Sequence, residues 1–150
     1  MSPFVAAGAG FLLAVLWFDL MFDVQVRGRR DGEVPDAALA SIAAYYRRVT
    51  TDARPMNRLV ASVMVLTVGA IAVQLADGDA PTWVAATSLG LASAPIVVAA
   101  VHTVPSAVRL GTEADGRSER SRLARSICRD HVLCITSIAS LLALQLAAGS

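Results

Sequence analysis

Charge and hydropathy are sharply separated along this chain of 150 residues. All thirteen basic residues fall in two segments, and the stretches between them are almost entirely apolar. Four stretches approach the roughly 20 apolar residues that a helix needs to cross a hydrocarbon core about 30 Å thick. They are residues 3–22, 59–76, 82–101 and 127–148. The pattern predicts an all-α fold, an integral membrane four-helix bundle, in one domain.

The arginines predict how this bundle is oriented. Seven lie in segment 24–58 and six in segment 103–129, whereas the short turn between the second and third spans carries only two aspartates. Arginine-rich loops stay on the cytoplasmic side of a membrane. We therefore expect a multi-pass protein of the cell (cytoplasmic) membrane with up-down-up-down topology, cytoplasmic loops 24–58 and 103–126, and both termini outside.

The first loop contains a short helical pattern. Its apolar side chains recur at helical spacing, at Leu39, Ile42, Ala43, Tyr46 and Val49. This spacing predicts a cytoplasmic amphipathic helix over about 36–50, lying on the membrane surface or packed beneath the spans. Asp36 suits its first turn, and Pro55 ends the pattern.

Polar side chains gather where the predicted spans meet the cytoplasmic side. They are Asp19, Asp23, Asn57, Arg58, His102, Arg129, Asp130 and His131. Asp19 and Asp23 are one helical turn apart, so they share a helix face. A carboxylate in hydrocarbon is costly, and we expect Asp19 to face the bundle interior and a partner there.

This layer has several interpretations. Carboxylates and imidazoles bind iron, zinc and manganese, so iron or another divalent transition metal is a candidate cofactor, which the sequence does not identify. The candidate metal ligands are Asp19, Asp23, His102 and His131. The candidate catalytic residues, which could also move protons, are Asp19, His102 and His131. The candidate substrate-binding residues are Trp17, Asn57, Arg58 and Arg129. Alternatively, the two arginines neutralise the aspartates in simple ion pairs.

Some stretches resemble a known family. The glycine-rich start of the first span, the stretch VHTVPSAVRLG and the stretch CRDHVLC are similar to small four-helix membrane proteins that include anthrone-oxygenase-like members. The resemblance covers most of the chain and implies four spans and oxidation of a lipophilic substrate. Two expected features of that family are absent: an Asn near the end of the third span and a Trp before the histidine of the fourth.

Two classes of function fit these observations. The first is an oxidoreductase that depends on a metal or on proton transfer and acts on a small lipophilic substrate. It requires Asp19 and both histidines to face one cavity. The second is a non-catalytic assembly subunit, scaffold or small carrier, in which the polar layer is structural ion pairing.

The expected partner of either class is the lipid bilayer. Small residues four apart, Gly10 with Ala14 and Gly90 with Ala94, predict close helix packing and a candidate surface for homo-oligomers. The second loop is short and has no aromatic residue to stack bases, so we expect no nucleic-acid partner.

Overall fold

The computed structural model describes residues 3–26 and 33–149, and the described chain contains helices and no strand. The α-helices are α1 (Pro3–Asp23), α2 (Asp36–Arg47), α3 (Arg54–Ala76), α4 (Thr82–Val98), α5 (Val104–Thr112) and α6 (Arg117–Ala148). A 3-10 turn follows α1 at Val24–Val26, and π-helical turns lie at Arg48–Asp52 and Ala99–Thr103. The predicted all-α bundle is confirmed.

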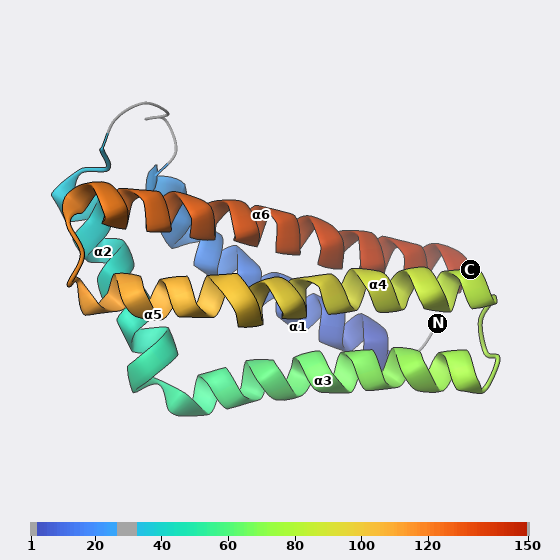
Figure 1. Ribbon diagram of the computed structural model, residues 1–150. Coiled ribbons are helices and arrows are strands. Elements are labelled where there is room, and N and C mark those ends of the chain that lie inside the picture. Colours follow the sequence, from blue (N-terminus) through green and yellow to red (C-terminus); the bar gives the residue numbers. More distant parts are fainter. Residues whose placement is uncertain (1–2, 27–32, 150) are drawn as a thin grey trace.

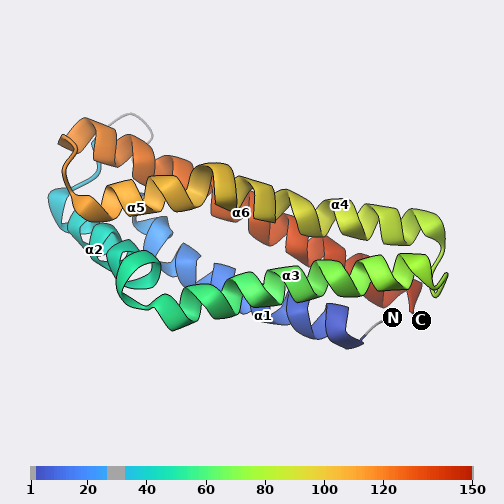
Figure 2. The ribbon, with the colours of Figure 1, turned by 60° about the horizontal axis from the view of Figure 1, so that its bottom comes forward.

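Four long helical segments form a ring in which each contacts its two neighbours. The contacts join α1 with α3, α3 with α4, α4 with α6, and α6 with α1. Both termini lie at one end of the bundle, and α2 lies across the other end (Figures 1 and 2). We call these the terminal end and the arginine-rich end. Arg27, Arg29 and Arg30 lie outside the described residues.

The four long segments have the length and hydropathy of membrane spans. They are Pro3–Val26, Pro55–Ala76, Thr82–Thr112 and Arg117–Ala148. Large apolar side chains on them are exposed, including Phe4, Phe18, Leu66, Trp83 and Val101. A soluble bundle would bury such side chains, whereas a bilayer accommodates them.

Two of these segments continue further than the hydropathy pattern predicts. The third runs through a π-helical turn into α5, and the fourth begins at Arg117, so the expected loop 103–126 shrinks to residues 113–116. Pro105 lies in the first turn of α5, where a missing N–H is tolerated, so it does not interrupt the third segment. The additional helical turns, in α5 and at the start of α6, are amphipathic rather than uniformly apolar. A search for apolar stretches therefore does not detect them.

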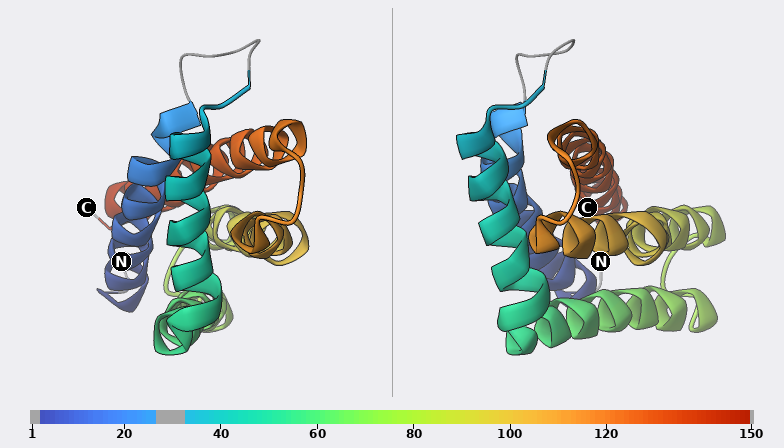
Figure 3. Two further views of the ribbon diagram at one scale, coloured as in Figure 1. Left: turned by 90° about the vertical axis from the view of Figure 1, so that its left-hand side faces the viewer. Right: turned by 60° about the vertical axis from the view of Figure 1, so that its left-hand side comes forward.

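The predicted amphipathic helix is confirmed as α2, and it packs against the bundle. Figure 3 shows it crossing the arginine-rich end. Its predicted inner face is buried at Leu39, Ile42, Ala43 and Tyr46. These residues pack with apolar side chains of α5 and α6 in one core cluster. A Cβ added at Gly111 would lie 3.2 Å from the backbone nitrogen of Arg47, so α2 and α5 are in close contact.

Two spans come into close contact at Gly8, a glycine outside the small-residue pairs that the sequence predicted. A Cβ added at Gly8 of α1 would lie 2.1 Å from the Oγ1 atom of Thr67 in α3. By contrast, Gly10 and Gly90 meet nothing within 4 Å. The predicted small-residue pairs therefore do not pack within the chain, and their role in homo-oligomers stays a prediction.

A proline in α4 is compensated from a neighbouring helix. Pro95 has no N–H to donate to the carbonyl oxygen of Leu91, one helical turn earlier. The hydroxyl of Ser137 in α6 donates to that oxygen at 2.8 Å. Within a bilayer no water is available for this role, so the serine satisfies the free carbonyl and ties α6 to α4.

Candidate functional site

At the centre of the polar layer, Asp23 of α1 lies between two donors. Its side chain is fully buried. Oδ1 accepts a hydrogen bond from the Tyr46 hydroxyl at 2.6 Å, and Oδ2 lies 2.6 Å from Nδ1 of His131. A carboxylate only accepts hydrogen bonds, so we assign the proton of this contact to Nδ1. In the neutral imidazole, Nε2 is then the basic nitrogen.

Asp19 lies on the other side of the same imidazole. Its Oδ1 accepts a hydrogen bond from the Tyr45 hydroxyl at 2.6 Å. Its Oδ2 is 3.8 Å from Nε2 of His131, which is too long for a direct hydrogen bond. Tyr45 is held in place by stacking on Phe22, with ring centroids 4.0 Å apart. Asp19 and Nε2 therefore face each other without a direct bond.

The two tyrosines come from consecutive positions of α2, outside the spans. Burial raises the pKa of each hydroxyl far above its ordinary value, and the negative charges of Asp19 and Asp23 raise it further. Both hydroxyls therefore stay protonated and act as donors to the aspartates. In this way α2 supplies the hydrogen bonds that a pair of carboxylates at a span end requires.

An apolar cavity of about 530 Å³ adjoins this cluster. All four long segments line it, with Leu16, Val60, Met64, Ile96 and Ile138 among the apolar residues. Its polar wall includes Asp19, Tyr45, Tyr46 and His131. This size and composition are typical of sites for small lipophilic molecules, where a few polar groups fix the orientation.

A second polar cluster lies between the third and fourth long segments. Oδ2 of Asp130 is 2.5 Å from Nδ1 of His102 and accepts a hydrogen bond from the Thr103 hydroxyl at 3.0 Å. Asp130 is largely buried, whereas the side chain of His102 is 44% exposed. His102 and Thr103 both belong to the π-helical turn, a feature that is frequent at functional sites.

The structure brings some predicted residues together and separates others. Asp19, Asp23 and His131 form one cluster, as expected, and Asn57 lines the cavity. His102 belongs to the second cluster and does not line the cavity, so both histidines do not face one cavity as the enzyme interpretation required.

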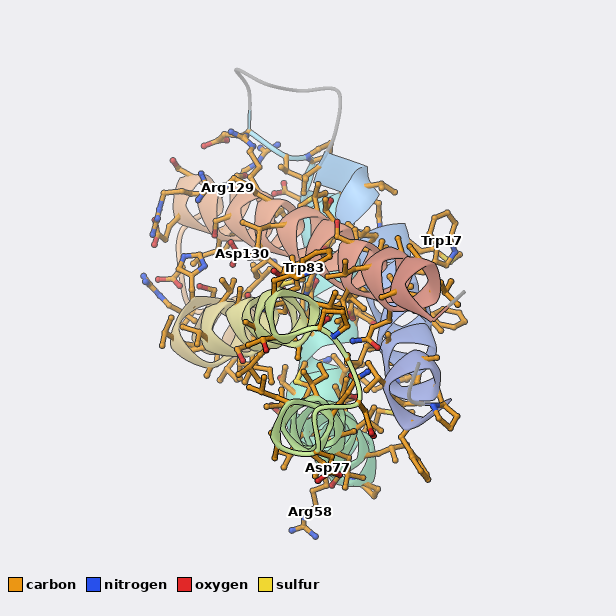
Figure 4. The ribbon with its side chains drawn as sticks, turned by 90° about the vertical axis from the view of Figure 1, so that its right-hand side faces the viewer. Trp17, Arg58, Asp77, Trp83, Arg129 and Asp130 are labelled. Carbon is orange, nitrogen blue, oxygen red and sulfur yellow. The ribbon has the colours of Figure 1, made fainter. Side chains whose placement is uncertain are left out.

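The other predicted substrate-binding residues lie elsewhere. Trp17, Arg58 and Arg129 are exposed and point away from the bundle (Figure 4). Tyrosines and a histidine hold the two aspartates, so the alternative of aspartate–arginine ion pairs is not what the structure forms. Helical spacing alone could not show that Arg58 and Arg129 project outward.

The predicted four-residue metal site is not assembled. Among residues 3–26 and 33–149, no group of three or more His, Cys, Asp or Glu side chains is arranged to hold a metal ion. The physical reason is the division of the two histidines. His131 contacts Asp23, whereas His102 contacts Asp130 in the second cluster, so the four predicted ligands do not converge on one point.

Three residues of these clusters are not among the site residues predicted from the sequence: Tyr45, Tyr46 and Thr103. A signal was present for Tyr46, which the helical pattern placed on the inner face of α2. A buried tyrosine hydroxyl usually finds a hydrogen-bond partner, so this position predicts a polar contact. Tyr45 and Thr103 carry no comparable signal, because neither lies on a helix face that the sequence pattern predicts to be buried.

No protein-family model matches the sequence, and no curated protein or solved structure matches it either.

Proposed function

We propose that the protein is a membrane enzyme that binds a small lipophilic molecule with an acidic hydroxyl group and removes its proton. The observation that carries this proposal is a histidine held by a buried carboxylate on the wall of an apolar cavity. Nδ1 of His131 is held by Asp23, and the imidazole lines the cavity. The free nitrogen, Nε2, would accept the proton.

The proposed step needs no group beyond those present. The O–H bond of the bound molecule breaks, its proton binds Nε2 of His131, and the oxygen keeps the electron pair. Asp23 fixes the tautomer and stabilises the imidazolium that forms, as the carboxylate partner of a catalytic histidine does. Asp19, 3.8 Å from Nε2, adds a second negative charge beside the imidazolium.

The bilayer is the proposed source of the molecule. Phe18 of α1 and Met56 of α3 line the cavity and are also 60% and 49% exposed. Side chains that are both cavity-lining and exposed on apolar helices mark an opening toward lipid. A compound dissolved in the hydrocarbon could pass between α1 and α3 without entering water.

Oxidation of the bound molecule remains a prediction of the sequence resemblance. The residues present account for binding and deprotonation. A non-catalytic carrier of lipophilic molecules is the second candidate, and the same apolar cavity favours it. In a carrier, Asp19 and His131 would only hydrogen-bond the polar group of the cargo and would not change its ionisation.

The two candidates differ in what happens to an ionisable probe. The experiment uses purified protein in lipid nanodiscs and an alkyl-substituted nitrophenol, whose phenolate absorbs visible light. The proposal predicts saturable binding and a larger phenolate fraction on the native protein than on His131→Gln. The phenolate fraction on Asp19→Asn is compared with the native value in the same way. A phenolate fraction that is equal in the native protein and both variants would favour the carrier.

Neighbouring alanines offer a matched test of the binding site. Ala99 lines the cavity, whereas the adjacent Ala100 is exposed and does not line it. Ala99→Phe should fill the cavity and weaken probe binding at least about tenfold, or about 1.4 kcal/mol. Ala100→Phe should leave binding unchanged. Equal affinities of these two variants would contradict the proposed binding site.

A further inference from the structure

We infer that Thr103, Asp130 and His102 form a proton route that connects the cavity with water at the arginine-rich end. This inference rests on the proposed function, because it assigns the path by which the proton taken by His131 leaves. The second cluster has no role in the proposed deprotonation itself.

The contacts of the second cluster are continuous from the cavity to the surface. Thr103 lines the cavity, and its hydroxyl donates to Oδ2 of Asp130 at 3.0 Å. The same oxygen lies 2.5 Å from Nδ1 of His102. The 44% exposure of the His102 side chain places the last member of the chain at the surface.

The other edges of the cavity offer no titratable relay to water. The wall at Tyr46 is closed, since this side chain is 2% exposed. At Phe18 and Met56 the cavity meets exposed apolar side chains, and a proton cannot leave through hydrocarbon. Thr50 and Asn57 form a further polar edge, but neither side chain titrates, whereas Thr103 leads to a carboxylate and an imidazole.

The position of the second cluster also fits an exit to water. Asp130 and His131 lie about 25 Å along α6 from its end at Ala148, using a rise of 1.5 Å per residue. The hydrocarbon core is about 30 Å thick, so this layer lies near its other boundary. Beyond it, α5 and α6 carry surface ion pairs, including Arg109 with Asp115 and Arg122 with Glu119.

Each transfer along the route conserves atoms and charge. The imidazolium of His131 gives its proton, through a water molecule or the bound molecule, to the oxygen of Thr103. Thr103 passes its own hydroxyl proton to the Asp130 carboxylate. The carboxyl group that results passes it to Nδ1 of the His102 tautomer that carries its proton on Nε2. His102 then releases a proton from Nε2 to water. Imidazole can do this because its two nitrogens act in turn as acceptor and donor.

Other charged groups near the route define its surroundings. His131 is the next residue to Asp130 on α6, and its own partners are Asp23 and Asp19. Cys134 lies one turn further along α6 and lines the cavity. These groups belong to the cavity side, whereas His102 links Asp130 to the surface.

The test measures how fast the bound nitrophenol gains or loses its proton after a change of pH, rather than its final phenolate fraction. Native protein in nanodiscs with the bound nitrophenol is mixed rapidly with buffer of a different pH, and the phenolate absorbance is followed. Thr103→Val and His102→Ala should slow re-equilibration by about a hundredfold, the lower end of what a positioned proton-transfer group contributes. The final phenolate fraction should match that of the native protein.

Two controls separate a proton route from a structural effect. Thr136 of α6 does not line the cavity, and its hydroxyl donates to Val132 of its own helix. Thr136→Val is therefore the matched substitution, and it should leave the rate unchanged. Added imidazole in the buffer should restore the rate of His102→Ala, which a change in packing would not allow.

The outcomes distinguish the route from the proposed function. If the probe binds and ionises but all variants re-equilibrate as fast as the native protein, the route is wrong and the proposed base stands. If His102→Ala is slow but imidazole does not restore it, His102 acts through packing, and the route is likewise wrong. If the probe is not ionised by the native protein, both proposals fail together.

Discussion

Asp23 and His131 are 108 positions apart in the chain, and their side chains meet at 2.6 Å in the interior of the bundle. The contact joins α1 to α6, and Tyr46 of α2 completes it from a third helix. A buried carboxylate is stable only when donors replace the water it has lost. This contact therefore fixes three helices relative to one another, and it also sets the tautomer of the proposed base.

The first prediction concerns the buried carboxylate. Asp23→Asn replaces an acceptor of two hydrogen bonds by an amide that has its own unpaired donors. We expect a loss of about 1–3 kcal/mol, the cost of leaving a buried polar group without its hydrogen-bond partner. Thermal unfolding in detergent measures the loss. Asp77→Asn, at an exposed position, is the matched control and should unfold as the native protein does.

The second prediction concerns the contact between α1 and α3. Gly8→Ala should destabilise the bundle by about 1–3 kcal/mol, the usual cost of overpacking, because the new Cβ would lie 2.1 Å from Oγ1 of Thr67. Gly10→Ala meets no neighbour and should be neutral or stabilising by at most about 1 kcal/mol. Thr67→Ala should recover much of the loss in Gly8→Ala. Equal unfolding of the two alanine variants would refute the close contact.

The third prediction concerns the proline in α4. Ser137→Ala leaves the carbonyl of Leu91 without its cross-helix donor and should cost about 0.6 kcal/mol, with an upper limit of about 1.7 kcal/mol. In a Pro95→Ala background, the restored N–H can donate to Leu91, so the same serine substitution should cost less. A double-mutant cycle measures this coupling, and Ser140→Ala, at an exposed position of α6, is the control. A coupling energy of zero would show that the serine does not compensate the proline.

The fourth prediction concerns orientation in the membrane. Cysteines introduced at exposed positions report which side they face, through labelling of intact cells with a membrane-impermeant maleimide. Asp79→Cys should be labelled in intact cells, and Ser118→Cys only after permeabilisation, because arginine-rich segments stay inside. Native Cys128 and Cys134 are buried and should react little with the maleimide. Labelling of the unsubstituted protein therefore measures the background signal. The reverse labelling pattern would show that the predicted topology is inverted.

A polar cluster at the terminal end contains contacts that the sequence could not predict. Gln74, Ser88 and Gln145 are polar residues in otherwise apolar spans. In the structure Nε2 of Gln145 donates to the hydroxyl of Ser88 at 2.9 Å and to Oε1 of Gln74 at 3.2 Å. Each residue lies on a different helix. Their meeting depends on the rotation of three helices about their axes, which uniformly apolar spans do not specify.

The sequence alone determined the class of fold, the four long helices and the inner face of α2. Hydropathy and helical periodicity are local properties, and both can be read within a window of about 20 residues. It also placed Asp19, Asp23 and His131 at one level of the bundle, because the level follows from the position along each span.

Only the tertiary structure decided which of these side chains meet. The direction of a side chain around its helix depends on packing between spans, and a span that is apolar on all sides leaves that direction open. For this reason His131 meets Asp23 while His102 pairs with Asp130, and Arg58 and Arg129 point outward. The tyrosines of α2 join the site because that helix folds back beneath the spans, a long-range contact that no local pattern contains.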